Sequence, residues 1–230
     1  MDVSHGAVFR AETRIAAGMT LAGAIGYLLA WAVILVVSPP GPRGPGEPTS
    51  QLVSAYADHS GAATLAAMFI AVFLVGPIAF MAGLRSSMRE RTADLPLLEV
   101  GLAAIAISVA LDSAAYSIAA AAAGLAADGA EDSIVVALDT AGHWLYGSAF
   151  GPLGAAVIAA GVATLRARVF PPMFCWLAIV AGGASLWGVV LLGVTEGEDE
   201  SGLADVVTTT AALGIGAWMI IAGGILWRRR

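Results

Sequence analysis

The chain has 230 residues, of which 59% are hydrophobic and only 12% are charged, and its formal net charge is −6. A soluble domain carries about 25% charged residues, and a chain this short keeps most of its surface in contact with solvent. Lipid is therefore expected to be that solvent over much of the surface. All eleven basic residues are arginine, which excludes Schiff-base chemistry on lysine, and their spread over several short segments argues against a nucleic-acid-binding face.

Six segments reach the roughly 20 mostly apolar residues that a membrane-spanning helix needs. They cover residues 15–37, 62–84, 97–126, 139–165, 172–194 and 205–227. The third and fourth segments are longer than the hydrocarbon requires, so we expect these helices to tilt or to project beyond it. No linker divides the chain. The sequence thus predicts a single all-α domain over residues 1–230, built as a polytopic membrane bundle of six helices.

The arginines predict how the chain threads the membrane. All of them except Arg43 lie before the first helix, in the second and fourth loops, or after the last helix. The loops on the other side carry acidic residues instead, among them Asp128, Glu131 and Glu198. Because loops rich in arginine stay in the cytoplasm, we expect both termini to be cytoplasmic and the protein to lie in the plasma membrane.

The first outer loop, residues 38–60, opens with a proline-rich stretch that is expected to be extended. Residues 51–59 are then expected to form a short helix at the membrane surface. Asp58 and His59 could cap the following helix, or His59 could meet His143 and hold a metal ion with nearby carboxylates. The spacing matches no known ligand motif, so the cap is the favoured interpretation, and we expect neither a metal nor a cofactor.

Small residues recur at intervals of four, which places them on one face of a helix. Gly18, Ala22 and Gly26 share such a face in the first helix, and Gly147 and Gly151 share one in the fourth. Spacing of this kind lets helix backbones approach closely in lipid. The contacts are expected within the bundle, with packing against a second copy of the chain as the alternative.

Asp112 is the sharpest candidate for chemistry. Counting about 1.5 Å per residue from the arginine-rich end of the third helix places it in the outer half of the hydrocarbon. An ionised carboxylate there costs several kcal/mol, and no arginine lies inside a predicted span to neutralise it. The neutral acid could donate a hydrogen bond or deliver a proton, and Tyr116 lies on the same helical face. Alternatively, Asp112 bonds a nearby carbonyl and only locks the bundle.

The fourth helix places further polar groups at a similar depth. Pro152 cannot donate a hydrogen bond to the carbonyl of Ser148, so a kink beside Gly151 would expose that carbonyl. We therefore predict that Asp112 pairs with it, directly or through water. Tyr146 and Ser148 are expected to line a binding site around Asp112. An ordinary proline kink without a function is the alternative.

His143 is a second candidate for acid–base chemistry. Asp139 lies four residues before it, so the two side chains share a face, and the carboxylate could orient the imidazole as a base. The favoured interpretation is less specific: a carboxylate at the start of a helix beside a histidine at the membrane interface. Trp187 lies too deep to be an interface anchor and is a candidate to line a substrate cavity, with ordinary packing as the favoured interpretation.

A resemblance to known proteins is carried by the arginine-marked inner loops, by the Leu111–Asp112 step and by the stretch HWLYGSAFGPLG from His143 to Gly154. In these features the chain resembles small multi-pass membrane proteins of high-GC bacteria, which are rich in alanine and glycine and whose activities are uncharacterised. The resemblance implies a fold class and a bacterial plasma membrane, and no activity.

Three functions remain open from the sequence. The first is a proton-linked site at Asp112 that binds or transports a small or lipid-like molecule. The second is an intramembrane enzyme in which Asp112 acts as a general acid on an isoprenoid or lipid. The third is a non-catalytic subunit whose small-residue faces bind a partner.

Overall fold

The computed structural model describes residues 3–37, 48–89, 95–194 and 201–229, and no strand occurs among them. The helices in chain order are α1 (Val3–Val37), α2 (Thr49–Asp58), α3 (Ser60–Phe73), α4 (Val75–Met88), α5 (Leu95–Ala127), α6 (Asp132–Arg166), α7 (Pro172–Val194) and α8 (Ser201–Arg228). Purely helical structure is what lipid requires, because a helix satisfies its own backbone hydrogen bonds.

Six helical segments are long and apolar enough to cross a membrane, as predicted. They are Glu12–Ile34, Ser60–Met88, Leu95–Ala127, Asp132–Arg166, Pro172–Val194 and Val206–Arg228. The chain is therefore a multi-pass integral membrane protein. The predicted limits hold closely except in the fourth span, which was expected to begin at residue 139 and begins at Asp132. Its added turns are mostly apolar, and Val135 in them is buried against Leu52 and Tyr56 of α2.

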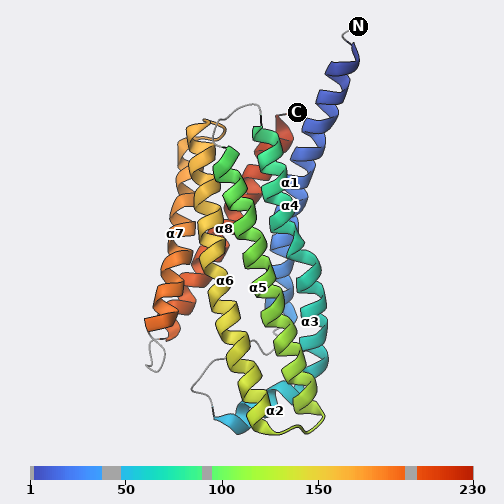
Figure 1. The fold of residues 1–230 in the computed structure, drawn as a ribbon, viewed down its shortest axis with the longest axis vertical. Coiled ribbons are helices and arrows are strands. Elements are labelled where there is room, and N and C mark those ends of the chain that lie inside the picture. The colour runs from blue at the N-terminus through green and yellow to red at the C-terminus, as the bar shows by residue number, and fades with distance from the viewer. Residues whose placement is uncertain (1–2, 38–47, 90–94, 195–200, 230) are drawn as a thin grey trace.

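The spans pack as a closed ring in which each helix contacts the next along the chain and α8 returns to α1. Both termini lie at the same end of the bundle (Figure 1). We call this the arginine end, because α4 and α6 end beside Arg85 and Arg166. The opposite, acidic end carries Asp128 and Glu131 in the turn between α5 and α6.

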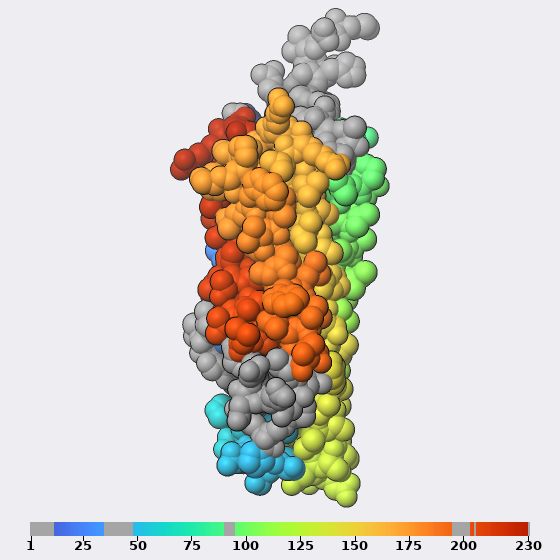
Figure 2. Space-filling model, turned by 90° about the vertical axis from the view of Figure 1, so that its left-hand side faces the viewer, coloured from blue at the N-terminus to red at the C-terminus, as the bar shows by residue number. Residues whose placement is uncertain are grey.

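At the acidic end α5 and α6 project beyond α7, and α2 lies across them (Figures 1 and 2). The short helix expected in the first loop over residues 51–59 is present as Thr49–Asp58. How far α5 and α6 project from the hydrocarbon stays a prediction. Leu52 and Tyr56 of α2 are buried against a small cluster that includes Ala122 of α5 and Val135 of α6. The overhang is thus a packed structure with its own apolar contacts.

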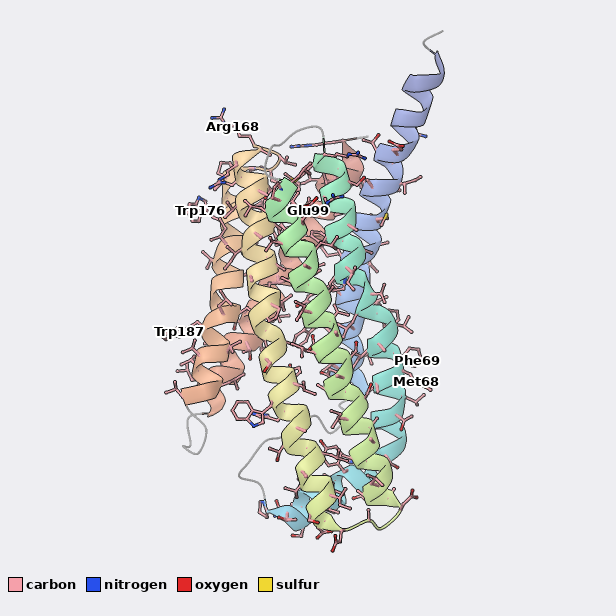
Figure 3. The ribbon with its side chains drawn as sticks, in the orientation of Figure 1. Met68, Phe69, Glu99, Arg168, Trp176 and Trp187 are labelled. Atoms are coloured by element: carbon pink, nitrogen blue, oxygen red, sulfur yellow. The ribbon has the colours of Figure 1, made fainter. Side chains whose placement is uncertain are left out.

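The outer surface of the ring is apolar, as contact with lipid requires. Met68 and Phe69 of α3 and Trp176 and Trp187 of α7 are exposed and point away from the bundle (Figure 3). The interior is closely packed, and Phe80 of α4 meets the buried Trp218 of α8 edge to face, with ring centroids 5.2 Å apart.

Glycines bring α1 and α4 into backbone contact, but not through the predicted face. Ala22 is exposed, and it is Gly23 together with Gly26 that meets Gly76 of α4. A Cβ at Gly23 would overlap the carbonyl of Gly76. The predicted face was wrong because the intervals of four skip Gly23, which lies three residues before Gly26.

The close glycine contact of α6 also involves a residue other than the predicted Gly147 and Gly151. A Cβ at Gly151 would meet nothing within 4 Å, whereas one at Gly154 would lie 2.5 Å from the carbonyl of Gly182 in α7. These close contacts lie within the bundle. Association of two copies of the chain stays a prediction.

The second span is interrupted, although the sequence predicted one continuous helix over residues 62–84. α3 ends at Phe73 and α4 begins at Val75, with Leu74 between them. Pro77 has no N–H to donate to the carbonyl of Phe73, and its ring crowds the preceding turn. Pro77 lies about one turn after the break at Leu74.

We expect Gly23→Ala to destabilise the protein by about 2 kcal/mol or more, because the added methyl group forces α1 and α4 apart. The change is measured as a lower midpoint of unfolding in mixed detergent. Gly124→Ala in α5 is the control, because a Cβ there meets nothing within 4 Å and alanine favours helix. Equal midpoints for Gly23→Ala and wild type would contradict the close contact.

Candidate functional site

One cavity lies between four segments of the ring: α1, the junction of α3 and α4, α5 and α6. Its volume is about 30 Å³, which is room for about two water molecules. Aliphatic side chains from α1, α6 and the α3–α4 junction form part of the wall, and the remainder is aromatic except for the carboxyl group of Asp112. The cavity therefore combines one ionisable group with a largely apolar lining.

Asp112 reaches this cavity because of its place on α5. The buried side chains Ile105, Ser108, Ala115 and Ala119 recur at intervals of three or four and define the face that points into the bundle. Asp112 continues that stripe, four residues after Ser108 and three before Ala115. Within the described part of the chain, no hydrogen bond or ion pair engages its carboxyl group.

Aromatic rings from α5 and α6 stand beside the carboxyl group. Tyr116, one turn after Asp112, meets Tyr146 edge to face with centroids 6.1 Å apart. Tyr146 in turn meets Phe150 at 5.2 Å, again nearly perpendicular. Such geometry is favourable for aromatic pairs, so the three rings hold one another in place. Tyr116 and Tyr146 were predicted to lie near Asp112, and both line the same cavity as its carboxyl group.

The other side of the cavity comes from α1. Tyr27 is buried, and its hydroxyl donates a hydrogen bond to the carbonyl of Ala212 in α8 at 3.2 Å. Trp31 follows one turn later and also lines the cavity. A charge on Asp112 would act on the hydroxyl groups of both Tyr27 and Tyr116. These two α1 residues were missed, although a tyrosine midway along the first span was a signal that pointed to them.

The break in the second span completes the wall. Ile70, in the last turn of α3, and Leu74, at the break itself, are buried and line the cavity. Leu74 still donates its N–H to the carbonyl of Ile70 at 2.8 Å. The close approach of Gly76 to α1 brings the junction against Tyr27. Pro77 and the glycines therefore shape the cavity from a distance.

Three predicted site residues lie elsewhere. His143 and Ser148 line a separate shallow groove against Leu192 of α7, and Trp187 is 58% exposed on the outside of the bundle (Figure 3). Side chains at positions i and i+2 of an α-helix point in directions about 200° apart. Ser148 therefore points away from Tyr146. For Trp187 the inward position on α7 belongs to Ser185.

No direct hydrogen bond joins Asp112 to the carbonyl of Ser148 among the described residues, so the direct form of the predicted pairing is not found, and pairing through water stays a prediction. α6 runs without interruption through Gly151 and Pro152. The polar contact in this turn comes from α7 instead, where Ser185 donates to the carbonyl of Phe150 at 2.8 Å. Depth alone suggested the pairing, whereas the rotation of α6 turns Ser148 toward α7.

Asp139 and the first outer loop also differ from expectation. Asp139 lies about two turns inside α6, is 2% exposed, and accepts a hydrogen bond from the hydroxyl of Tyr56 in α2 at 2.7 Å.

His59 makes no side-chain cap to α3; its Nδ1 lies 2.9 Å from the carbonyl of Ala55. Over the described ranges of the chain, no three histidine, cysteine or acidic side chains gather as metal ligands.

Of the predicted site residues, Asp112, Tyr116 and Tyr146 thus share one cavity, which Tyr27 and Trp31 complete from α1. Comparison with protein families, with curated proteins and with solved structures gives no match.

We expect Tyr56→Phe to lower the free energy of unfolding by about 1–3 kcal/mol, because the buried carboxyl group of Asp139 loses the hydrogen bond that the Tyr56 hydroxyl donates. Unfolding in mixed detergent measures the change. Ser54→Ala is the control on the same helix, since its hydroxyl bonds only the exposed carbonyl of Gln51. Stability unchanged by Tyr56→Phe would mean that α2 does not depend on this hydrogen bond.

Proposed function

We propose that this multi-pass membrane protein binds or transports a small molecule in a proton-linked manner at the Asp112 cavity. The observation that carries the proposal is a carboxyl group inside the spans that has no hydrogen-bond partner among the described residues and borders a water-sized cavity. Ionisable groups inside a membrane are rare and mark ion pathways and proton relays by default. An unpaired one beside space for water is able to gain and lose a proton.

The surroundings of the carboxyl group support proton exchange over structural locking. Two other buried polar side chains have a partner, Asp139 with Tyr56 and Ser185 with Phe150, and the buried groups without one among the described residues, such as the indole N–H of Trp218, are not acidic. Asp112 is held by packing, on an inward stripe of α5. Its position lies about 25 Å along the helix from Leu95, at 1.5 Å per residue, and hence well inside the span.

The size of the cavity favours a small ligand. Sites for drug-sized molecules occupy about 300–1,000 Å³, and the cavity beside Asp112 has about 30 Å³. An isoprenoid or a lipid chain is far larger. The alternative of a general acid acting on such a substrate therefore has no supporting observation, and we retain the small-molecule function.

We further propose that the arginine end faces the cytoplasm of a bacterial cell and that the site lies toward the outer leaflet. The support is the charge distribution between the two ends. Arg168 and Arg228 lie at the end that carries the termini, and Asp128 and Glu131 lie at the opposite end. The resemblance to multi-pass proteins of high-GC bacteria agrees with this threading.

Infrared spectroscopy of the purified protein tests the proton exchange without a ligand. We expect a carbonyl band from a neutral carboxylic acid that shifts when water is replaced by heavy water and that disappears in Asp112→Asn. Glu99→Gln on the same helix is the control, since Glu99 is exposed and pairs with Arg85 at 2.7 Å; it should keep the band. A band that resists exchange, or loss of folding in Asp112→Asn, would assign Asp112 a structural role.

Labelling with a membrane-impermeant maleimide tests the threading. In a Cys175→Ala background, which removes the lone and buried cysteine, Asp128→Cys should react in intact cells. Arg168→Cys should react only after the cells are permeabilised. The reverse pattern would invert the orientation while leaving the six spans unchanged.

A further inference from the structure

We infer that the Asp112 cavity selects a small ammonium cation, such as ammonium or methylammonium, and exchanges it for the proton on Asp112. The inference rests on the proposed function and adds the chemical class of the ligand. It follows from three properties of the cavity: the sign of its one ionisable group, the aromatic character of its wall, and its size.

The carboxylate needs a positive counter-ion, and none of the described residues that line the cavity provides one. No arginine or histidine lines the cavity. The groups that face Asp112 are the phenols of Tyr27 on α1, Tyr116 on α5 and Tyr146 on α6, together with Ile70 and Leu74 from the second span. An isolated carboxylate in an apolar surround is strongly disfavoured. A proton or an external cation must therefore neutralise it.

The wall suits an ammonium ion better than a metal ion. Aromatic rings from both sides, Tyr27 and Trp31 on α1 and Tyr116, Tyr146 and Phe150 on α5 and α6, stand around one carboxylate. Cations held against aromatic faces are stabilised by the ring quadrupole, and this is how proteins recognise ammonium groups. A hydrated metal ion would lose its water shell and find few oxygen ligands in return. An ammonium group donates its N–H groups to those few oxygens and rests its remaining surface on the rings.

The volume sets an upper limit on the ligand. About 30 Å³ holds about two water molecules. Ammonium is close to one water in size, and methylammonium has two heavy atoms. Tetraethylammonium is several times larger and should be excluded by the packed rings of Tyr116, Tyr146 and Phe150.

Exchange follows from charge balance. With the proton bound, the site is a neutral carboxylic acid; with the cation bound, it is a neutral carboxylate–ammonium pair. One methylammonium therefore enters as one proton leaves, and the O–H bond of Asp112 breaks as the ionic contact forms. Neither state leaves an uncompensated charge in hydrocarbon. Binding of the two is mutually exclusive because they share one carboxyl group.

Calorimetric titration of the detergent-solubilised full chain with methylammonium chloride tests the inference. Repeating the titration in two buffers of different ionisation enthalpy gives the protons released, and we expect close to one per cation bound near the pH at which Asp112 is protonated. Asp112→Asn should bind no methylammonium. Sodium chloride and tetraethylammonium chloride at the same concentration should give no binding.

A matched pair of phenylalanine variants tests the aromatic wall. Phe150→Leu should weaken methylammonium binding about tenfold, since a desolvated cation–π contact is worth about 1–2 kcal/mol. Phe69→Leu on α3 should leave affinity unchanged, because Phe69 is exposed and points away from the bundle (Figure 3). Equal affinities for the two variants would overturn the role assigned to the rings.

The outcomes separate the ligand class from the underlying function. If the infrared band of Asp112 exchanges in heavy water but methylammonium neither binds nor releases a proton, the ammonium assignment fails and the proton-linked site stands. Binding of sodium in place of methylammonium, or binding that persists in Asp112→Asn, would also overturn the assignment. If the band does not exchange, the proposed function fails together with the inference.

Discussion

The structure depends on one constraint: inside a bilayer, a polar group must find its partner within the protein. The backbone meets this requirement by being helical throughout the spans. Several side chains meet it in the same way: Thr20 donates to the carbonyl of Ala16 in its own helix, and Tyr27 donates to the carbonyl of Ala212 in a neighbouring one. Asp112 differs from them and from the unpartnered indole N–H of Trp218, because it is an acid that borders water-sized space and has no hydrogen-bond partner in the described chain.

Close packing elsewhere creates the space beside Asp112. Gly23 and Gly76 allow the backbones of α1 and α4 to touch. The second span is interrupted at Leu74, just before Gly76, and Pro77 lies about one turn after this break. Leu74 at the break and the aromatic residues Tyr27 and Trp31, which follow Gly26 on α1, have large side chains. At these residues the two helices cannot approach each other as closely as they do at the glycines. A gap remains between them, at the level where the inward stripe of α5 carries Asp112. The cavity is thus a consequence of small residues next to large ones along the same helices.

The overhang at the acidic end obeys the same constraint in a different solvent. There α5 and α6 extend beyond α7, and α2 packs across them through Tyr56, whose hydroxyl donates a hydrogen bond to the buried Asp139. This carboxyl group is satisfied and buried, whereas Asp112 is neither paired nor fully enclosed. Two acids on adjacent helices therefore have different surroundings, because Asp139 in the overhang meets a donor from α2 and Asp112 inside the span faces rings and space.

The amino-acid sequence by itself determined the six spans, the overhang of the third and fourth, the short α2, and the shared face of Asp112 and Tyr116. These follow from the length of apolar runs and from helical periodicity, which are local properties. Only the tertiary structure decided which faces meet. The rotation of each helix turned Ser148 and Trp187 away from Asp112 and brought Tyr27 toward it, and rotation depends on contacts between segments far apart in the chain, which no local pattern records.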